Sequence, residues 1–165
     1  MTKTQDNLRD AFAGESQANR RYLAFAKQAE LEGYPQVAKL FRAAAASETV
    51  HALSHLRTLG DVKTTAENLQ VAIQGENYEH VSMYPEFIAE AESAGEKKAL
   101  GSFSRAMEVE KEHEALYKAA LDNLGSDQGD LDYYICPFCG STHYGKAPEK
   151  CPVCGTPGTK FERIS

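Results

Sequence analysis

Two short motifs in the sequence place a histidine three residues after a glutamate. They are Glu48-Thr-Val-His51 and Glu110-Lys-Glu-His113. Residues three apart on an α-helix lie on the same face, so each motif can offer a carboxylate oxygen and an imidazole nitrogen to one metal cluster. A single motif of this kind is usually a solvated helix face, but two of them indicate shared metal chemistry.

A second group of metal-binding residues lies near the C-terminus. Two Cys-x-x-Cys pairs contain all four cysteines of the chain: Cys136, Cys139, Cys151 and Cys154. Four thiolates give tetrahedral sulfur coordination, which suits zinc or iron, and the spacing leaves both metals open. A glycine follows each pair, at Gly140 and Gly155, and backbone N–H groups in such turns can point at sulfur and raise an iron reduction potential.

Long helices must position the Glu-x-x-His motifs. Ala, Glu, Leu, Lys and Gln dominate the first 125 residues, and Gly or Pro interrupts them at a few points. These breaks predict helices over 4–32, 35–59, 65–94 and 96–124, which we expect to form an all-α, antiparallel four-helix bundle. Pro85 predicts a kink or local break in the third helix.

The composition changes at residue 131, where Tyr, Cys, Pro and Gly replace Ala and Glu. A segment of this size is too small to fold by apolar burial alone, so we expect a metal to hold a small β/loop domain together. The predicted organisation is a bundle over 1–125, a linker over 126–130 and the cysteine domain over 131–165.

Acids interrupt the apolar stripe near the middle of each predicted helix. Burying a lone charged glutamate costs free energy, because its charge leaves water. If the helix middles meet at one height in the bundle, several buried glutamates there require cations to compensate their charge. Two iron ions would supply that charge. The residues expected at this level are Glu15, Glu48, His51, Glu76, Glu79, Glu110 and His113. Glu108, Glu112, Glu114 and His80 lie off the stripe and are expected to face water. His55, on the stripe, is expected in the core or beside the metals.

Composition excludes several other functions. The net charge of −6 argues against nucleic acid as a partner. No apolar run is long enough to span a membrane, and the first residues lack the apolar core of a secretory signal. Four thiols in metal-type pairs suggest a reducing compartment, so we expect a cytoplasmic protein. A glycine-rich dinucleotide fingerprint is missing, so binding of a nicotinamide cofactor by this chain is not expected.

The chain resembles the rubrerythrin family over its whole length. The resemblance rests on "AFAGESQANRRY", "SETVH", "GENYEHVSMYPEF", "EVEKEH" and the cysteine segment "CPFCG…GKAPEKCPVCG". It implies a ferritin-like bundle with a rubredoxin-like Fe(Cys)4 domain. The seven acids and histidines named above would ligate the di-iron site, with Glu48 and Glu110 bridging. Glu79 matches the family's extra carboxylate ligand. In the family, one iron is thought to shift on reduction and to exchange this glutamate for the histidine that corresponds to His51. Tyr22 and Tyr84 match tyrosines near the cluster. The connection between His51 and Glu76 looks shorter than in longer members.

The resemblance implies a peroxidase that reduces hydrogen peroxide to water for oxidative-stress defence. Glu79 would relay protons, with Tyr22 close by, and the Fe(Cys)4 centre would pass electrons from a rubredoxin or an NAD(P)H-dependent reductase. The alternatives are a ferritin-like iron oxidation and binding protein, and a non-catalytic protein with zinc in the cysteines.

About a dozen helical residues, roughly 18 Å, separate His113 from Gly125. We therefore expect the cysteine domain to start far from its own di-iron site and to serve a partner in a head-to-tail homodimer or higher oligomer.

Overall fold

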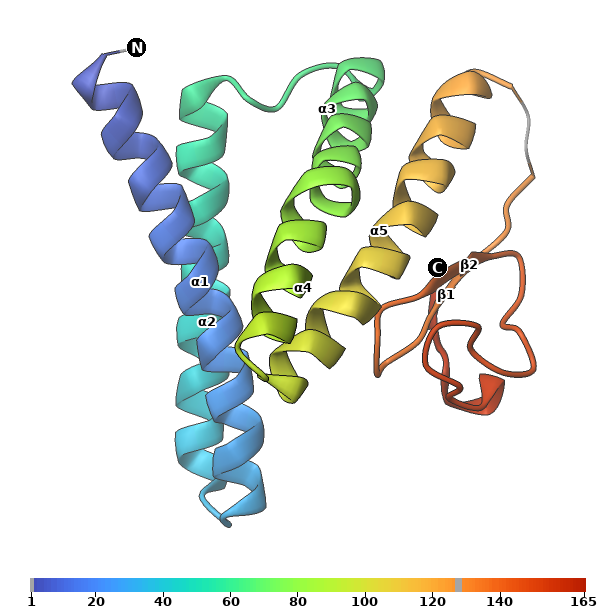
Figure 1. Ribbon diagram of the computed structural model, residues 1–165. Helices are drawn as coiled ribbons and strands as arrows, with labels where there is room; N and C mark the ends of the chain where they lie inside the picture. The colour runs from blue at the N-terminus through green and yellow to red at the C-terminus, as the bar shows by residue number, and fades with distance from the viewer. Residues whose placement is uncertain (1, 127–128) are drawn as a thin grey trace. The chain divides into compact units, whose positions relative to one another are not determined.

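The computed structural model describes residues 2–126 and 129–165. Its chain forms two compact units, one ending at Lys63 and the other beginning at Thr64 (Figure 1). The first is a hairpin of α1 (Lys3–Leu31) and α2 (Pro35–Leu59). The second contains α3 (Thr65–Tyr78), a π-helical turn η1 (Glu79–Met83), α4 (Tyr84–Ser93), α5 (Lys97–Asp122) and a small sheet. The four predicted helical segments are confirmed, with ends within two residues of the prediction.

Local signals explain where these helices begin and end. Thr2 and Thr64 each cap a helix start and exchange hydrogen bonds with the residue three positions later, Gln5 or Glu67. Pro35 opens α2, where a missing N–H costs nothing. Gly60 ends α2 in the left-handed conformation at φ 74°, which a residue with a Cβ rarely adopts.

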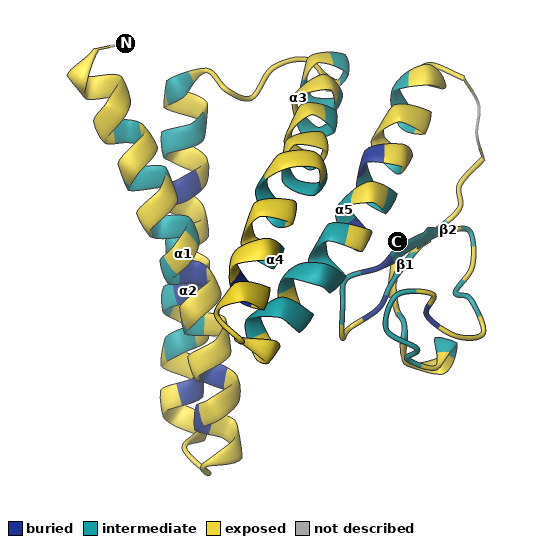
Figure 2. Ribbon diagram, in the orientation of Figure 1, coloured by how far each residue is buried: buried dark blue, intermediate teal, exposed yellow. Residues whose placement is uncertain are grey.

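Small residues form the contact between α1 and α2. The buried positions of the hairpin are alanines, Ala26, Ala29, Ala38, Ala45 and Ala52, together with Asn19 (Figure 2). The Asn19 amide donates to the Ala45 carbonyl oxygen at 2.7 Å and to the Thr49 hydroxyl at 2.8 Å. Alanines let the two backbones approach closely, and the amide then fixes their register.

The break that Pro85 predicts is confirmed as a π-helical turn directly before it. Proline lacks an N–H and its ring clashes with the carbonyl four residues earlier, so a regular α-helix cannot continue through it. The wider turn η1 accommodates Pro85 at the start of α4. The rings of Tyr84, Phe87 and Phe103 then pack together, with centroids 5.5–6.3 Å apart, and join α4 to α5.

A three-stranded antiparallel sheet lies after α5, with β1 (Tyr133–Ile135) between β2 (Thr142–Tyr144) and β3 (Glu162–Ile164). A 3₁₀ turn, η2 (Gly158–Lys160), precedes β3. Within residues 129–165, the buried apolar side chains are Cys136 and Cys151. So small a core agrees with the expectation that a metal holds this domain together. The proposed linker over 126–130 includes residues 127–128, which lie outside the described residues.

Across the described ranges, no helix combines the length and the apolarity that crossing a bilayer requires.

Candidate metal centres

The hairpin of α1 and α2 brings together Glu15, Glu48 and His51, called here the first ligand set. One potential ligand atom from each residue lies within 4.8 Å of the others. Nδ1 of His51 lies 2.8 Å from Oε2 of Glu48 and 4.0 Å from Oε1 of Glu15. The Glu-x-x-His spacing on α2 therefore places both side chains on one face, as predicted, and α1 adds the second carboxylate.

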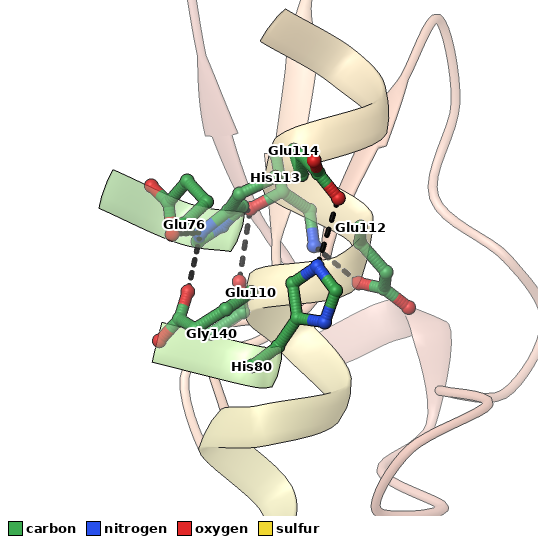
Figure 3. A network of polar contacts seen from close by, with 8 residues as sticks. Glu76, His80, Glu110, Glu112, His113, Glu114 and Gly140 are labelled. Atoms are coloured by element: carbon green, nitrogen blue, oxygen red, sulfur yellow. Dashed lines mark hydrogen bonds and ion pairs between the residues drawn. The ribbon is translucent and has the colours of Figure 1, made fainter. Parts of the chain in front are cut away.

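The second compact unit contains a matching group, Glu76, Glu110 and His113, called here the second ligand set. Its ligand atoms also lie within 4.8 Å of one another. Nδ1 of His113 lies 2.8 Å from Oε2 of Glu110 and 3.8 Å from Oε2 of Glu76 (Figure 3). Each set thus has one glutamate from one helix and a Glu-x-x-His pair from another. In both histidines the nitrogen that faces the acids is Nδ1.

The charges of the second ligand set are strongly interdependent. Burial, together with the neighbouring Glu110, raises the pKa of Glu76 to about 7. The hydrogen bond from His113 lowers the pKa of Glu110, and the same bond raises the pKa of His113. Glu76 and His113 therefore hold protons nearer to neutral pH than exposed residues of their kind would, while Glu110 stays ionised, and a cation could replace those protons. Such a donor set of carboxylates and imidazole suits iron.

The other predicted site residues belong to neither three-residue group. Glu79 is half-buried on η1, and burial followed by the charge of Glu110 raises its pKa. Burial and the charge of Glu110 also raise the pKa of Tyr84. Tyr22 is half-buried on α1, with its ring centroid 6.4 Å from that of Phe25 and 6.1 Å from that of Phe41. Their roles stay predictions.

The expectation that His80 and Glu114 face water is wrong. Glu114 is buried, and its Oε2 lies 2.8 Å from Nε2 of His80 (Figure 3). Its other oxygen accepts from the Asn77 amide at 3.0 Å and pairs with Lys118 at 2.8 Å. Lys118 and His80 hold the pKa of Glu114 at about 2. The wider turn η1 lets consecutive residues Glu79 and His80 both face α5, which a regular helical period does not anticipate.

The four cysteines converge into one group, called here the cysteine cage. Their sulfur atoms lie within 4.8 Å of one another, and Sγ of Cys136 is 3.5 Å from that of Cys154, as is Cys139 from Cys151. Metal–sulfur bonds of about 2.3 Å in a tetrahedron require sulfurs about 3.7 Å apart. The observed spacing therefore fits one four-coordinate metal.

Backbone groups shape the cage in two matching turns. The Gly140 N–H donates to the Cys136 carbonyl at 2.9 Å, and the Gly155 N–H donates to the Cys151 carbonyl at 3.0 Å. Burial opposes the charged form of Cys154, but the hydroxyl and N–H of Thr156 outweigh it and lower its pKa to about 6. Hydrogen bonds of this kind stabilise thiolate, the form that binds metal.

The cysteine domain contacts α5 at the second ligand set. The Thr142 hydroxyl lies 3.1 Å from Nε2 of His113, and the Thr142 N–H donates to Oε2 of Glu112 at 3.2 Å. We expected the cysteine domain to start far from its own di-iron site and therefore to serve a partner's site. That inference is wrong for His113, because β2 returns to the side of α5. The expectation that Glu112 faces only water is wrong for the same reason.

Comparison with known proteins gave two family matches. A model described as "Rubrerythrin" matches residues 6–121, and one described as "Rubrerythrin, rubredoxin-like domain" matches residues 134–162. The chain is similar to Rubrerythrin-2 of Clostridium acetobutylicum, with 38% identity over 96% of this chain and 95% of that protein. It is also similar to Nigerythrin of Nitratidesulfovibrio vulgaris, with 37% identity over 96% and 85% of the two chains.

Solved structures agree in fold. The chain matches nigerythrin in a mixed-valent state with a TM-score of 0.61 and 36% identity, covering 99% of this chain and 88% of that chain. A fully reduced, all-ferrous state of nigerythrin matches equally well, at a TM-score of 0.61. Nigerythrin was thus solved both in a mixed-valent state and in an all-ferrous state. The helical part therefore has the ferritin-like fold of nigerythrin. The two ligand sets and the cage bring together the carboxylate, imidazole and thiolate groups that iron sites of this family require.

Proposed function

Because the chain belongs to the rubrerythrin family, we propose that it is a non-haem di-iron peroxidase that reduces hydrogen peroxide to water. One observation carries this proposal. The same chain contains two matched carboxylate–histidine sets and a four-cysteine cage, and β2 of the cysteine domain contacts a histidine of one set. A storage protein would need the acids but would have no use for an electron-input module.

The proposed ligands follow from the two sets and the cage. Iron bound there would supply the electrons for peroxide reduction and would polarise its O–O bond as a Lewis acid. The first and second ligand sets, with Glu79, would hold two iron ions, and Cys136, Cys139, Cys151 and Cys154 would hold a third. Glu48 and Glu110, the acids of the two Glu-x-x-His pairs, are the proposed bridging carboxylates.

Protons are the second requirement of the reaction, since each peroxide consumes two protons and two electrons to give two waters. Burial raises the pKa of Glu79 and, with Glu110, that of Glu76. Both carboxyl groups can therefore hold a proton closer to neutral pH than an exposed glutamate can, and Glu79 is our candidate for the relay. Tyr22 is proposed to donate a hydrogen bond beside the first ligand set.

Electrons would come from an external rubredoxin or NAD(P)H-dependent reductase and would enter at the cysteine cage. Association into a head-to-tail homodimer or a larger oligomer stays a prediction. Light scattering of the iron-loaded protein tests it, and a strictly monomeric, fully active protein would contradict it. A very large shell-like particle would instead favour iron oxidation and storage.

The first experiment is an anaerobic peroxide titration. The iron-loaded protein is reduced chemically, which bleaches the iron–sulfur colour of the cage, and one equivalent of hydrogen peroxide is added without oxygen. Return of the colour within seconds is expected, because electrons would leave the cage for the bundle and then for peroxide. The variant His51→Ala, which lacks one bundle ligand but keeps every cysteine, should recover its colour far more slowly.

A cage that stays bleached in the unsubstituted protein, or equal recovery in His51→Ala, would contradict the peroxidase proposal. The second outcome would mean that peroxide oxidises the cage directly.

A further inference from the structure

The contact between Thr142 and His113 joins the cysteine domain to the second ligand set. The Thr142 hydroxyl lies 3.1 Å from Nε2 of His113 and 2.9 Å from the carbonyl oxygen of Gly140, to which it donates. The three groups form a short chain that runs from the turn of the cysteine cage to the imidazole ring.

The directions of these hydrogen bonds follow from the number of hydrogens available. A hydroxyl carries one hydrogen, and that of Thr142 goes to the Gly140 carbonyl, which can only accept. Toward His113 the hydroxyl must therefore accept, so Nε2 of the ring must carry a hydrogen. The other ring nitrogen, Nδ1, faces Oε2 of Glu110 at 2.8 Å. Nδ1 also carries a hydrogen while it donates to Glu110. Once that hydrogen leaves, Nε2 keeps its own, and the lone pair of Nδ1 points into the second ligand set, where a metal ion would take it.

We propose that Thr142 is a positioning residue that fixes the tautomer and ring orientation of His113 for metal binding, and that formation of the cysteine cage sets Thr142 in place. The proposal rests on the proposed function in so far as His113 is taken as an iron ligand. It assigns a role in the bundle site to a residue of the cysteine domain.

The surroundings of Thr142 explain how the cage controls its position. The Thr142 N–H is held by Glu112 on α5 at 3.2 Å. The preceding residue, Ser141, is fully buried, and its carbonyl accepts from the Cys136 N–H at 2.9 Å. Gly140 approaches α5 so closely that a Cβ on it would lie 3.8 Å from the Val109 side chain. The backbone from Gly140 to Thr142 therefore contacts both the cysteine cage and α5.

Zinc binding tests the proposal without any redox turnover. Full-length protein whose cage is already filled with zinc is titrated with further Zn²⁺ against a chelator, which measures the affinity of the bundle site. Loss of an outer hydrogen-bond partner of a metal-binding histidine costs about 10- to 100-fold in affinity. We expect such a loss in Thr142→Val, which keeps the shape of threonine without its hydroxyl, and affinity close to the unsubstituted value in Thr142→Ser. Thr159→Val, at an exposed position of the same domain, is the control.

Nitrogen-15 NMR of the histidine rings supplies a second readout. In the unsubstituted zinc-loaded protein, Nε2 of His113 should carry the hydrogen, and Thr142→Val should shift its signal while the His51 signals serve as the reference. Unchanged zinc affinity and an unchanged His113 signal in Thr142→Val would overturn the proposal. Equal losses in Thr142→Ser and Thr142→Val would also overturn it, because packing of the methyl group would then explain the effect. Zinc cannot reduce peroxide, so failure here is distinct from failure of the peroxidase proposal.

Discussion

Metal uptake by the second ligand set should release more protons at pH 6 than at pH 8. Burial and Glu110 raise the pKa of Glu76 to about 7. A group with that pKa is about nine-tenths protonated at pH 6 and about one-tenth at pH 8, and a metal binds only the carboxylate. Glu76 alone should thus release about 0.8 more proton at pH 6, and the apparent affinity should fall about tenfold from pH 8 to pH 6.

His113 should also release more protons and weaken metal binding at pH 6 relative to pH 8. Its hydrogen bond to Glu110 raises its pKa, so more of it is charged at pH 6 than an ordinary histidine would be, and Nδ1 must lose its hydrogen to bind a metal.

Calorimetry measures both quantities. Zinc is titrated into protein with a filled cage, at each pH in two buffers with different heats of ionisation, and the difference in heat gives the protons released. Glu76→Gln should bind more weakly with a smaller difference between the two pH values. Glu108→Gln, at an exposed acid of the same helix as Glu110, should match the unsubstituted protein. Equal proton release and equal affinity at both pH values would refute the reasoning.

Three further predictions concern stability. Because Lys118 and His80 hold the pKa of Glu114 at about 2, below the ordinary 4.5, its stabilising effect is full above pH 4.5 and is lost as the pH falls toward 2. Glu114→Gln should therefore lower the melting temperature at pH 7 but not near pH 2. Gly158→Ala should disrupt the cysteine domain, seen as lost zinc binding, since its Cβ would meet a backbone oxygen at 1.8 Å, whereas Gly14→Ala meets nothing within 4 Å. Asn19→Ala should lower the unfolding free energy by about 1–3 kcal/mol in denaturant titrations, through loss of buried hydrogen bonds. An unchanged melting temperature of Glu114→Gln at pH 7, full zinc binding by Gly158→Ala, or an unchanged denaturation midpoint of Asn19→Ala would contradict the corresponding contact.

The helices and the Glu-x-x-His pairs were predictable because both depend on short-range rules. Gly60 and the caps at Thr2 and Thr64 mark helix ends within a few residues of chain. A spacing of three on a helix places an acid and a histidine side by side whatever the helix packs against, and the distance of 2.8 Å occurs in both pairs. These features require no knowledge of tertiary structure.

The contacts that were missed depend on departures from regular geometry or on distant segments. The pairing of His80 with Glu114 joins residues 34 apart and follows from the π-helical turn, which shifts the helical period after Tyr78. The contact between Thr142 and His113 requires β2 to pack against α5, and no periodic pattern in the sequence predicts that packing. One signal was available in retrospect: Pro85 indicated a disturbed helix, and residues just before it could have been assigned to either face.

The π-helical turn also bears on the ancestry of the two hairpins. Glu15 lies 16 residues before the end of α1 at Leu31, and Glu76 lies 17 residues before the end of α4 at Ser93. The connecting loops are equal in length, and Glu48 and Glu110 each lie 13 residues after the start of their helix. Between the ligand glutamate and the end of the helix, the segment that contains η1 is therefore one residue longer than the corresponding segment of α1, although both helical arms have 29 residues in all. A π-turn is what one inserted residue produces in a helix. Such a difference is what duplication of one hairpin gene, followed by a one-codon insertion, would leave behind. In that history the same insertion turned Glu79 toward the acids of α5, so that the second hairpin has a further carboxylate beside its ligand set.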